Sequence, residues 1–332
     1  MSQTLRWGIL GTASIAKRSV IPGIRGSMRN EVVAIASRNQ ENADEAAKEL
    51  HIESAYGSYE SLLASDDIDA VYIPLPNHLH LEWTLRAAEA GKHILCEKPI
   101  ALNSAEAEKM VEACEKAGVH LAEAFMYRHH PRYQLIQDAI RSGEIGELRG
   151  IHANFTFNSA GSTENIRYHK DWGGGSLYDV GCYPISVARL LIGQEPEAVT
   201  AQALFSEKHG GVDMMTSGFV EFPNSISLIF DCGMWAAFRN EMEVLGTDGV
   251  LKVPSAFASD PNTDSSFYIE GKLGNRCVEV PSVNHYSLMA DDFAAVVLDG
   301  SKPKFDSQDA VLNMKVLESA LRSAEQRKRI EL

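Results

Sequence analysis

The first 125 residues alternate short apolar runs with helical patterns, and this alternation constrains the fold more than any other feature. The apolar runs end in Gly, Ser or Pro, as strands do, and they cover residues 7–10, 32–36, 70–73, 93–96 and 120–124. Helical patterns follow at 14–24, 42–50, 59–64, 79–90 and 104–117. Strands that alternate with helices predict a parallel, doubly wound sheet with helices on both faces.

After residue 125 the pattern changes. Helical patterns appear at 131–142, 177–191 and 311–325, and alternating segments appear at 149–157, 199–205, 217–221, 225–231 and 241–245. Turn sequences at 223–224 and 246–249 connect some of these segments, as antiparallel hairpins require. We therefore predict an α/β domain over residues 1–125 and an α+β domain with a substantial sheet over residues 126–332.

Composition excludes several classes of function. The chain has 31 Lys and Arg against 45 Asp and Glu, a net charge of −14, whereas nucleic-acid binding requires a basic face. Its five cysteines are far apart, and no pair has CxxC spacing, so neither a disulfide framework nor a metal site is expected. No apolar run reaches the roughly 18–20 residues of a membrane helix, and the first residues lack a signal peptide's apolar stretch. These features predict a cytoplasmic protein.

A glycine-containing turn joins the first strand to the first helix. Within GILGTASIA (8–16), a GxGxxG pattern that begins at Gly11 has Ala13 and Ala16 in its second and third glycine positions. A turn at this place can hold a dinucleotide pyrophosphate on free helix amides. The alternative is a tight turn without a ligand. The expected cofactor contacts of this turn are Gly11, Thr12, Ala13, Ser14 and Ile15.

The end of the second strand predicts which dinucleotide binds. An NAD-selective site usually carries Asp or Glu there, but this sequence has Ser37 and Arg38. A guanidinium can pair with the 2′-phosphate of NADP, and the serine hydroxyl can donate a hydrogen bond to it. We therefore expect a preference for NADP(H), with NAD(H) as a possible second cofactor; an ordinary surface arginine is the alternative.

Four further segments carry polar residues suited to chemistry. Three follow predicted strands, where open α/β sheets bind ligands: PLPNHLH (74–80), EKP (97–99) and EAFMYR (123–128). The fourth is DWGGGSLYDVGCYP (171–184) in the second half. Together these segments resemble the Gfo/Idh/MocA family of oxidoreductases, with EKP after AGKHILC as the most specific mark and GGGSLYDVGCYPI nearly as specific.

The resemblance extends over essentially the whole chain. It implies a Rossmann domain followed by an α+β domain with a large, open, mainly antiparallel sheet, which in relatives often mediates homodimers or homotetramers. It also implies a cis peptide bond at Lys98–Pro99. Members of this family move hydride between a nicotinamide and a carbon of a sugar or polyol.

Three catalytic residues follow from the resemblance. Lys98 resembles the catalytic lysine of the family, and Asp179 and Tyr183 match its D-x-x-x-H or D-x-x-x-Y element. Tyr183 stands where inositol dehydrogenases have His, so the chain resembles the branch of glucose–fructose oxidoreductase, xylose dehydrogenase, dihydrodiol dehydrogenase and ketosugar reductases. We expect Tyr183 to act as acid and base, with electrostatic support from Lys98. Asp179 would bind substrate or orient Lys98; alternatively, it ties down the glycine turn.

Further contacts are expected around these three residues. Contacts to the cofactor are expected from Pro74, Leu75, Asn77, His80, Glu97 and Lys98. Contacts to the substrate are expected from Tyr127, Arg128, Arg167, Trp172, Asp179 and Tyr183. His80 has the alternative of a helix-face residue. Trp172 is suited to a cleft wall because sugars stack on aromatic faces.

The sequence leaves the substrate open. A nucleotide-linked sugar needs cations for its diphosphate, which Arg128, Arg132, Arg167 and Lys170 could supply, whereas a free sugar does not. The net charge of −14 favours a neutral substrate. A trans-dihydrodiol, or inositol or another polyol, is a further alternative. A dinucleotide-binding sensor or regulator without turnover is an alternative of another class.

Overall fold

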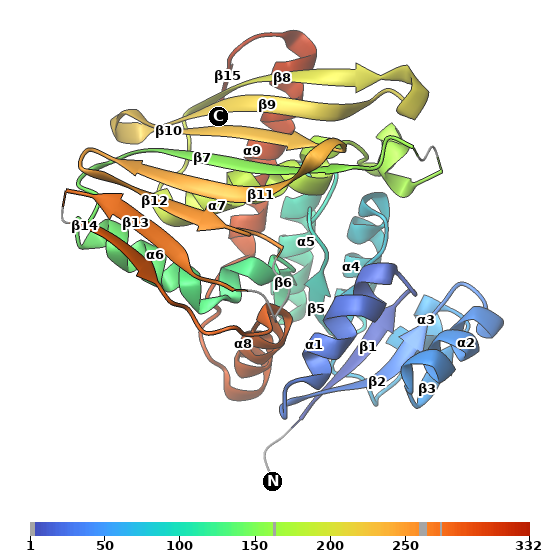
Figure 1. Cartoon of the computed structure of the whole chain (residues 1–332). Coiled ribbons are helices and arrows are strands. Elements are labelled where there is room, and N and C mark those ends of the chain that lie inside the picture. The colour runs from blue at the N-terminus through green and yellow to red at the C-terminus, as the bar shows by residue number, and fades with distance from the viewer. Residues whose placement is uncertain (1–3, 162–163, 259–263, 273) are drawn as a thin grey trace. The chain divides into compact units, whose positions relative to one another are not determined.

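The computed structural model describes residues 4–161, 164–258, 264–272 and 274–332 of the chain (Figure 1). These residues form two units. The first holds Met1–His129 and Asn284–Val311, and the second holds His130–Val283 and Leu312–Leu332. The division near residue 129 is close to the expected boundary at 125, but the return of Asn284–Val311 to the first unit was not expected.

A parallel six-stranded sheet organises the first unit, with the order β3-β2-β1-β4-β5-β6. Its strands are β1 (Leu5–Leu10), β2 (Asn30–Ala36), β3 (Ser54–Tyr56), β4 (Ala70–Ile73), β5 (His93–Cys96) and β6 (Leu121–Glu123). β1 and β4 are almost wholly buried, as strands covered by helices on both faces must be. The strand order reverses between β1 and β4, where open α/β sheets bind their ligands. The predicted doubly wound fold is confirmed.

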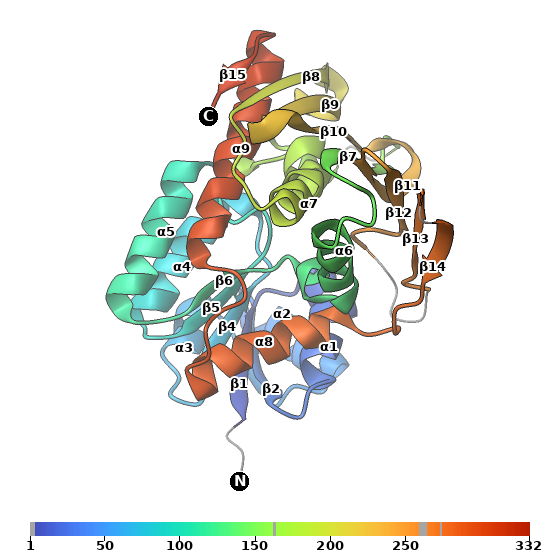
Figure 2. The ribbon, with the colours of Figure 1, turned by 90° about the vertical axis from the view of Figure 1, so that its left-hand side faces the viewer.

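Helices cover both faces of this sheet, with α4 and α5 on one side and α1 and α8 on the other (Figure 2). The helices of this unit are α1 (Ile21–Arg25), preceded by a π-helical turn (Ala16–Val20), α2 (Gln40–Leu50), α3 (Tyr59–Leu63), α4 (His80–Glu89), α5 (Ser104–Ala117) and α8 (His285–Asp299). Local sequence sets the ends of α5. The side chain of Asn103 accepts the Glu106 amide at 2.9 Å, and Gly118 closes the helix with φ +68°.

Helix α8 joins the first unit through its apolar face. The Phe293 ring lies 4.8 Å from the rings of both Trp7 and His120, measured between centroids. Ser287 Oγ donates to the Gly23 carbonyl at 2.8 Å, and a Cβ atom at Gly23 would lie 2.4 Å from Tyr286 Cβ. This close approach needs a glycine in α1, so α1 and α8 are matched in sequence although they are far apart in the chain.

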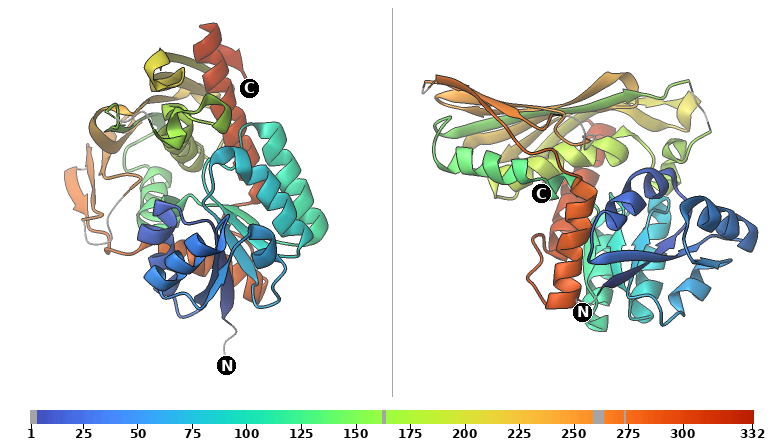
Figure 3. Two further views of the ribbon diagram at one scale, coloured as in Figure 1. Left: turned by 90° about the vertical axis from the view of Figure 1, so that its right-hand side faces the viewer. Right: turned by 60° about the horizontal axis from the view of Figure 1, so that its bottom comes forward.

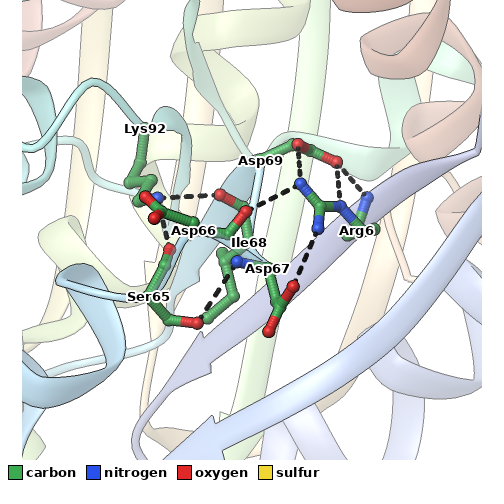
Figure 4. A network of polar contacts seen from close by, with 7 residues as sticks. All are labelled: Arg6, Ser65, Asp66, Asp67, Ile68, Asp69 and Lys92. Atoms are coloured by element: carbon green, nitrogen blue, oxygen red, sulfur yellow. Dashed lines mark hydrogen bonds and ion pairs between the residues drawn. The ribbon is translucent and has the colours of Figure 1, made fainter.

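A polar network ties the start of β1 to the loop before β4 (Figure 4). Arg6 donates to both carboxylate oxygens of Asp69, at 2.8 and 3.0 Å, and contacts Asp67 at 3.4 Å. Lys92 donates to two main-chain carbonyls of the same loop at 2.7 and 2.9 Å. Partial burial acts to raise the pKa of Asp69, but the hydrogen bonds from Arg6 hold that pKa below its ordinary value. The acidic segment 66–69 therefore has a structural role: it connects the amino-terminal ends of β1 and β4.

The second unit is built on a nine-stranded sheet with the order β14-β13-β12-β11-β7-β10-β9-β8-β15. Its strands are β7 (Leu148–Asn158), β8 (Ala198–Ser206), β9 (Val212–Phe222), β10 (Ile226–Gly233), β11 (Trp235–Gly246), β12 (Gly249–Pro254), β13 (Phe267–Gly271), β14 (Gly274–Val278) and β15 (Ile330–Glu331). The turns at 223–224 and 246–249 join antiparallel pairs, as predicted. Strands β7 and β10 run parallel, so the sheet is mixed but mainly antiparallel.

Helices α6 (Pro131–Arg141), α7 (Cys182–Ile192) and α9 (Ser307–Gln326) are the longer helices of this part of the chain, and α9 begins within the first unit. α6 and α7 lie along one face of the nine-stranded sheet (Figure 3). The side chains on that face are buried and apolar: Ile151, Ala153, Val220, Leu228, Phe230, Met242 and Val244. In the described part of the chain, no helix has the length and apolar character needed to span a membrane.

Candidate functional site

Gly11 shapes the turn after β1. Its φ angle is +108°, and a Cβ atom there would lie 3.0 Å from Leu75 Cδ2, so a side chain is disfavoured on both counts. The first helical bond runs from the Lys17 amide to the Ala13 carbonyl at 3.2 Å, so the amides just before it have no acceptor within the helix. The residues after Gly11 are at least partly accessible: Thr12, Ala13, Ser14 and Ile15. The turn therefore fits a dinucleotide pyrophosphate.

Arg38 is exposed at the tip of β2, next to the buried Ser37. Within the residues that the structure describes, its guanidinium has no hydrogen bond or ion pair. Burial raises the pKa of the nearby Tyr59 phenol, and the positive charge of Arg38 acts in the opposite direction. Lys17, a second candidate cation near the turn, is paired with Glu49 at 2.5 Å. The exposed guanidinium of Arg38 is thus suited to a 2′-phosphate.

The turn that carries Lys98 is held by hydrogen bonds from neighbouring residues. Glu97 accepts a hydrogen bond from the Tyr72 hydroxyl at 2.6 Å and from the Lys98 amide at 3.2 Å. The Lys98–Pro99 peptide bond is cis, as the resemblance implies. The next amide, that of Ile100, donates to Glu123 Oε1 at 2.9 Å. Tyr72 and Glu123 were not predicted as contributors to this turn. Tyr72 bonds to Glu97 and Glu123 to Ile100, and each pair is more than 20 residues apart in the sequence.

His80 connects this turn to the loop after β4. Its Nδ1 lies 3.0 Å from the Pro99 carbonyl oxygen, and its Nε2 lies 2.8 Å from that of Leu75. Complete burial lowers the pKa of His80 to about 4, so the neutral ring donates to one of the two carbonyls. The ring is thus engaged by the protein itself. The other predicted members of this loop are the buried Pro74 and the half-buried Asn77.

Tyr127 and Arg128 follow β6 in a short helical turn, and both are buried. The Tyr127 ring packs edge-on against Phe125 at 5.9 Å. Arg128 forms an ion pair with Asp309, and its guanidinium lies 4.7 Å from the centre of the Phe125 ring. Burial disfavours the charge of Arg128, but Asp309 outweighs this and raises the pKa above its ordinary value. The structure places Arg128 in an internal ion pair rather than on an open surface.

Other expected substrate contacts are also engaged within their unit. Arg132 is fully buried and donates to the main-chain carbonyl of Ser255 at 2.9 Å. Lys170 is exposed and paired with Glu325 at 3.0 Å. Trp172 is 38% exposed and stacks on His169, with ring centroids 4.1 Å apart. These contacts reduce the number of cations available for a substrate diphosphate.

Three glycines allow close packing before the helix that carries Asp179. Gly173 and Gly175 have φ angles of +74° and +113°. A Cβ atom at Gly174 would lie 2.4 Å from the Arg167 carbonyl oxygen, and one at Gly175 would lie 2.0 Å from Asp213 Oδ1. The glycine turn therefore lies directly on residues 166–172 on one side and on Asp213 on the other.

Asp213 is a buried carboxylate that anchors the start of this helix. Its Oδ2 accepts hydrogen bonds from Ser176 Oγ at 2.7 Å, the Leu177 amide at 2.8 Å and Thr216 Oγ1 at 2.8 Å. Burial raises its pKa above the ordinary value, although these bonds act in the opposite direction. We did not predict Asp213 from the sequence. An isolated acidic residue in the apolar segment VDMM (212–215) was the available signal.

Asp179 and Tyr183 lie one helical turn apart, where a π-helical turn (Leu177–Gly181) continues into α7. Asp179 Oδ2 accepts a hydrogen bond from Arg167 Nε at 2.6 Å, and its side chain is 16% exposed. The buried Tyr183 ring packs against both Phe155 and Phe257, at 5.3 and 5.6 Å between centroids. The second unit therefore joins Arg167, expected only as a substrate contact, to the motif that holds Asp179 and Tyr183.

Comparisons with known proteins agree with these features. Residues 5–125 match the model of an oxidoreductase family with an NAD-binding Rossmann fold, and residues 133–252 match the GFO/IDH/MocA C-terminal domain. A D-xylose 1-dehydrogenase (NADP(+)) of Haloferax volcanii is 38% identical over 99% of this chain and 100% of its own length. A dTDP-3,4-didehydro-2,6-dideoxy-α-D-glucose 3-reductase of Actinomadura kijaniata is 34% identical over 92% of both chains.

Solved structures share the fold of this chain. A 3-ketoreductase from Actinomadura kijaniata, in complex with NADP and TDP-benzene, matches with a TM-score of 0.90 and 32% identity, covering 97% of this chain and 98% of that one. An aldose–aldose oxidoreductase from Caulobacter crescentus, complexed with glycerol, matches with a TM-score of 0.91 and 27% identity, covering 99% and 100%. Both similarities extend over the two units.

Proposed function

Because the chain belongs to the Gfo/Idh/MocA family of oxidoreductases, we propose that it is an NADP(H)-dependent dehydrogenase acting on a hydroxyl-bearing carbon of a small sugar. The observation that carries this proposal is the pair Asp179 and Tyr183 in one motif, with Arg167 bonded to the carboxylate. NADP in the name of the Haloferax relative and in the complex of the Actinomadura structure supports the choice of cofactor.

The residues of this chain fit the cofactor. The turn at Gly11 leaves helix amides for a pyrophosphate, and Arg38 presents an exposed guanidinium to a 2′-phosphate. The turn after β5, braced by Glu97, would direct Lys98 toward the reacting oxygen. When bound, the nicotinamide supplies or accepts the hydride, and the protein supplies the proton chemistry and the orientation.

Tyr183 is the proposed acid and base. A phenol has a pKa of about 10 in isolation, so it needs neighbouring positive charge to act near neutral pH. Lys98 is proposed to supply that charge and to stabilise the oxygen that gains negative charge during the reaction. The rings of Phe155 and Phe257 hold the tyrosine in place, which favours a single direction of its hydroxyl.

A free sugar is the substrate class that the charges favour. A nucleotide-linked sugar carries a diphosphate, which is usually bound by accessible Arg or Lys side chains. The four candidates are engaged within the protein: Arg128, Arg132, Arg167 and Lys170. We therefore propose an unphosphorylated aldose, in agreement with the name of the Haloferax relative.

A substrate panel tests this function. Initial rates are measured at 340 nm with NADP(H) and NAD(H), in both directions, on free aldoses, a dTDP-linked ketosugar, inositol and a trans-dihydrodiol. We expect turnover of at least one free aldose with NADP. Turnover of only the dTDP-sugar, inositol or the dihydrodiol would contradict a free aldose and would assign the enzyme to the class of the compound that reacts. NADPH binding without turnover of any compound would favour the sensor and contradict the enzyme.

Arg38→Ala should change the choice of cofactor. Loss of a charge-assisted contact to the 2′-phosphate should raise KM for NADP about 10–100-fold. KM for NAD should stay within about twofold, because NAD has no phosphate at this position. Steady-state kinetics with both dinucleotides measure the effect, and Arg141→Ala, an exposed arginine of α6, is the control. An equal change for both cofactors would contradict a phosphate contact.

We further propose that the chain forms a homo-oligomer through the outer face of the nine-stranded sheet. On that face Phe219 and Ile229 are register partners, 42% and 45% exposed, and Leu204 on β8 is 56% exposed. Glu243 and Lys252 are partners in the same row of the sheet, so opposite charges are available beside the apolar patch. An apolar patch with both signs of charge suits a second copy of the same surface.

The double variant Phe219→Glu with Ile229→Glu should separate the copies. Two carboxylates on each copy would be buried against each other, which is unfavourable without partners. Light scattering coupled to gel filtration should give a monomer mass for the variant and a multiple of it for the wild type. Leu135→Glu on α6 is the control for an exposed apolar residue elsewhere. A wild-type monomer, or an oligomer that survives the double variant, would contradict this interface.

The cytoplasm is our proposal for the location of the enzyme. All five cysteines are free thiols in the structure, and four of them are buried. Widely spaced, unpaired cysteines are typical of proteins from reducing compartments.

A further inference from the structure

We infer that Arg167 is a positioning residue that neutralises Asp179 and thereby allows the Tyr183 hydroxyl to ionise near neutral pH. This inference rests on the proposed function, because it assigns a purpose to the proton chemistry of Tyr183. It goes beyond the expected role of Arg167 as a substrate contact.

The first argument is the geometry of the ion pair. Arg167 Nε and Asp179 Oδ2 are 2.6 Å apart, and Asp179 is the more buried partner, with 16% of its side chain exposed against 40% for Arg167. Arg167 Nη1 also lies 3.4 Å from Asn165 Oδ1, and its guanidinium lies 6.0 Å from the Phe157 ring centre. The arginine is thus held on several sides, so its direction is set before any substrate binds.

The second argument is that the backbone fixes the same contact. The Gly175 amide donates to the Arg167 carbonyl at 2.9 Å, and the Asp179 amide donates to the Gly175 carbonyl at 3.0 Å. A side chain at Gly174 would collide with the Arg167 carbonyl. The glycine turn therefore connects Arg167 to the start of the helix that carries Asp179 and Tyr183. The arginine and the segment that holds these two residues are thus parts of one local structure.

The third argument is electrostatic. Asp179 is the main cause that raises the pKa of Arg167 above its ordinary value, and Tyr168 and Tyr183 act in the same direction. Asp179, Tyr168 and Tyr183 are thus titratable groups that act on this guanidinium, and the two rings packed against Tyr183, those of Phe155 and Phe257, carry no charge. An uncompensated carboxylate beside a phenol raises the pKa of that phenol, and an arginine on the carboxylate cancels this effect.

The sign of the expected change follows directly. Without Arg167, the negative charge of Asp179 would oppose ionisation of Tyr183. The apparent pKa in the pH profile of kcat for sugar oxidation should then move upward by about one unit or more. Arg167→Lys keeps a positive charge and should bring the profile back most of the way. Asp179→Asn combined with Arg167→Ala removes the carboxylate charge as well and should also move the profile back toward that of the wild type.

The experiment measures kcat and KM for the sugar against pH, with saturating NADP, for Arg167→Ala, Arg167→Lys and the double variant. Arg276→Ala, which removes an exposed cation of β14 paired with Glu144, is the control and should leave the profile unchanged. Thermal unfolding of each variant reports the folded fraction. An upward shift of the apparent pKa in Arg167→Ala, reversed in Arg167→Lys and in the double variant, supports the inference.

Two results would overturn it. An increase in the sugar KM at every pH with an unchanged kcat profile would make Arg167 a substrate contact. A loss of rate in Arg167→Ala that follows its folded fraction, with no upward shift in the pH profile of its folded protein, would make the ion pair structural only. The proposed function fails separately: Tyr183→Phe would then keep the wild-type rate, whatever Arg167 does.

Discussion

Tyr183→Phe should lower kcat about 10²–10⁴-fold for the sugar that the enzyme turns over, the usual contribution of a general acid or base. The change removes only the hydroxyl, and the ring is packed against Phe155 and Phe257, so the fold should be kept. Affinity for NADPH should stay within about twofold, because the tyrosine belongs to the proton chemistry and not to the dinucleotide site. Initial rates and NADPH fluorescence titration measure the two quantities.

Tyr268→Phe on β13 is the control, since Tyr268 is an exposed tyrosine of the same unit, and its kcat should be that of the wild type. Lys98→Met should reduce kcat by a comparable factor, about 10²–10⁴-fold, because it removes the charge proposed to support Tyr183. If Tyr183→Phe retains a rate within about threefold of the wild type, the acid–base role must be given to another group.

The first unit shows how much of a fold local sequence can determine. Strand β4 at Ala70–Ile73 and helix α5 at Ser104–Ala117 lie where the apolar pattern and the capping residues predict them. Helix α8 also carries local signals, with Asn284 as its N-cap and Gly300 at its end. In the sequence, however, most strands of the second unit's sheet stand between this helix and the rest of the first unit. Its packing on Trp7 depends on contacts between distant residues, which no local pattern contains.

The candidate site shows the same limit at the level of single residues. Residues inside one motif, such as Asp179 and Tyr183, could be named from the family resemblance that the motif carries. The partner of a charged residue could not: Arg128 looked like a substrate cation, yet Asp309, 181 positions away, pairs with it. Asp213 likewise acts on Ser176 from 37 positions away. Sequence patterns indicate which residues carry chemistry, whereas the fold decides which of them are already engaged.

Asp213→Ala should lower the free energy of unfolding by about 3–5 kcal/mol, because it leaves three buried donors without their acceptor. These are Ser176 Oγ, the Leu177 amide and Thr216 Oγ1, which all bond to one carboxylate oxygen. Asp213→Asn should cost less, since it keeps the shape and one acceptor and removes a charge that burial disfavours. Urea unfolding followed by circular dichroism gives both values.

Asp231→Ala is the control for this prediction, because Asp231 is a half-buried carboxylate of β10 that pairs with Ser217 at 2.5 Å outside the core. Its cost should stay below about 1 kcal/mol, the range of surface interactions. Because Asp213 holds the start of the helix that carries Asp179 and Tyr183, the Asn variant should also lose activity in excess of its loss of folded protein. Unchanged stability in Asp213→Ala would mean that water replaces the carboxylate and that the glycine turn alone fixes the direction of the helix.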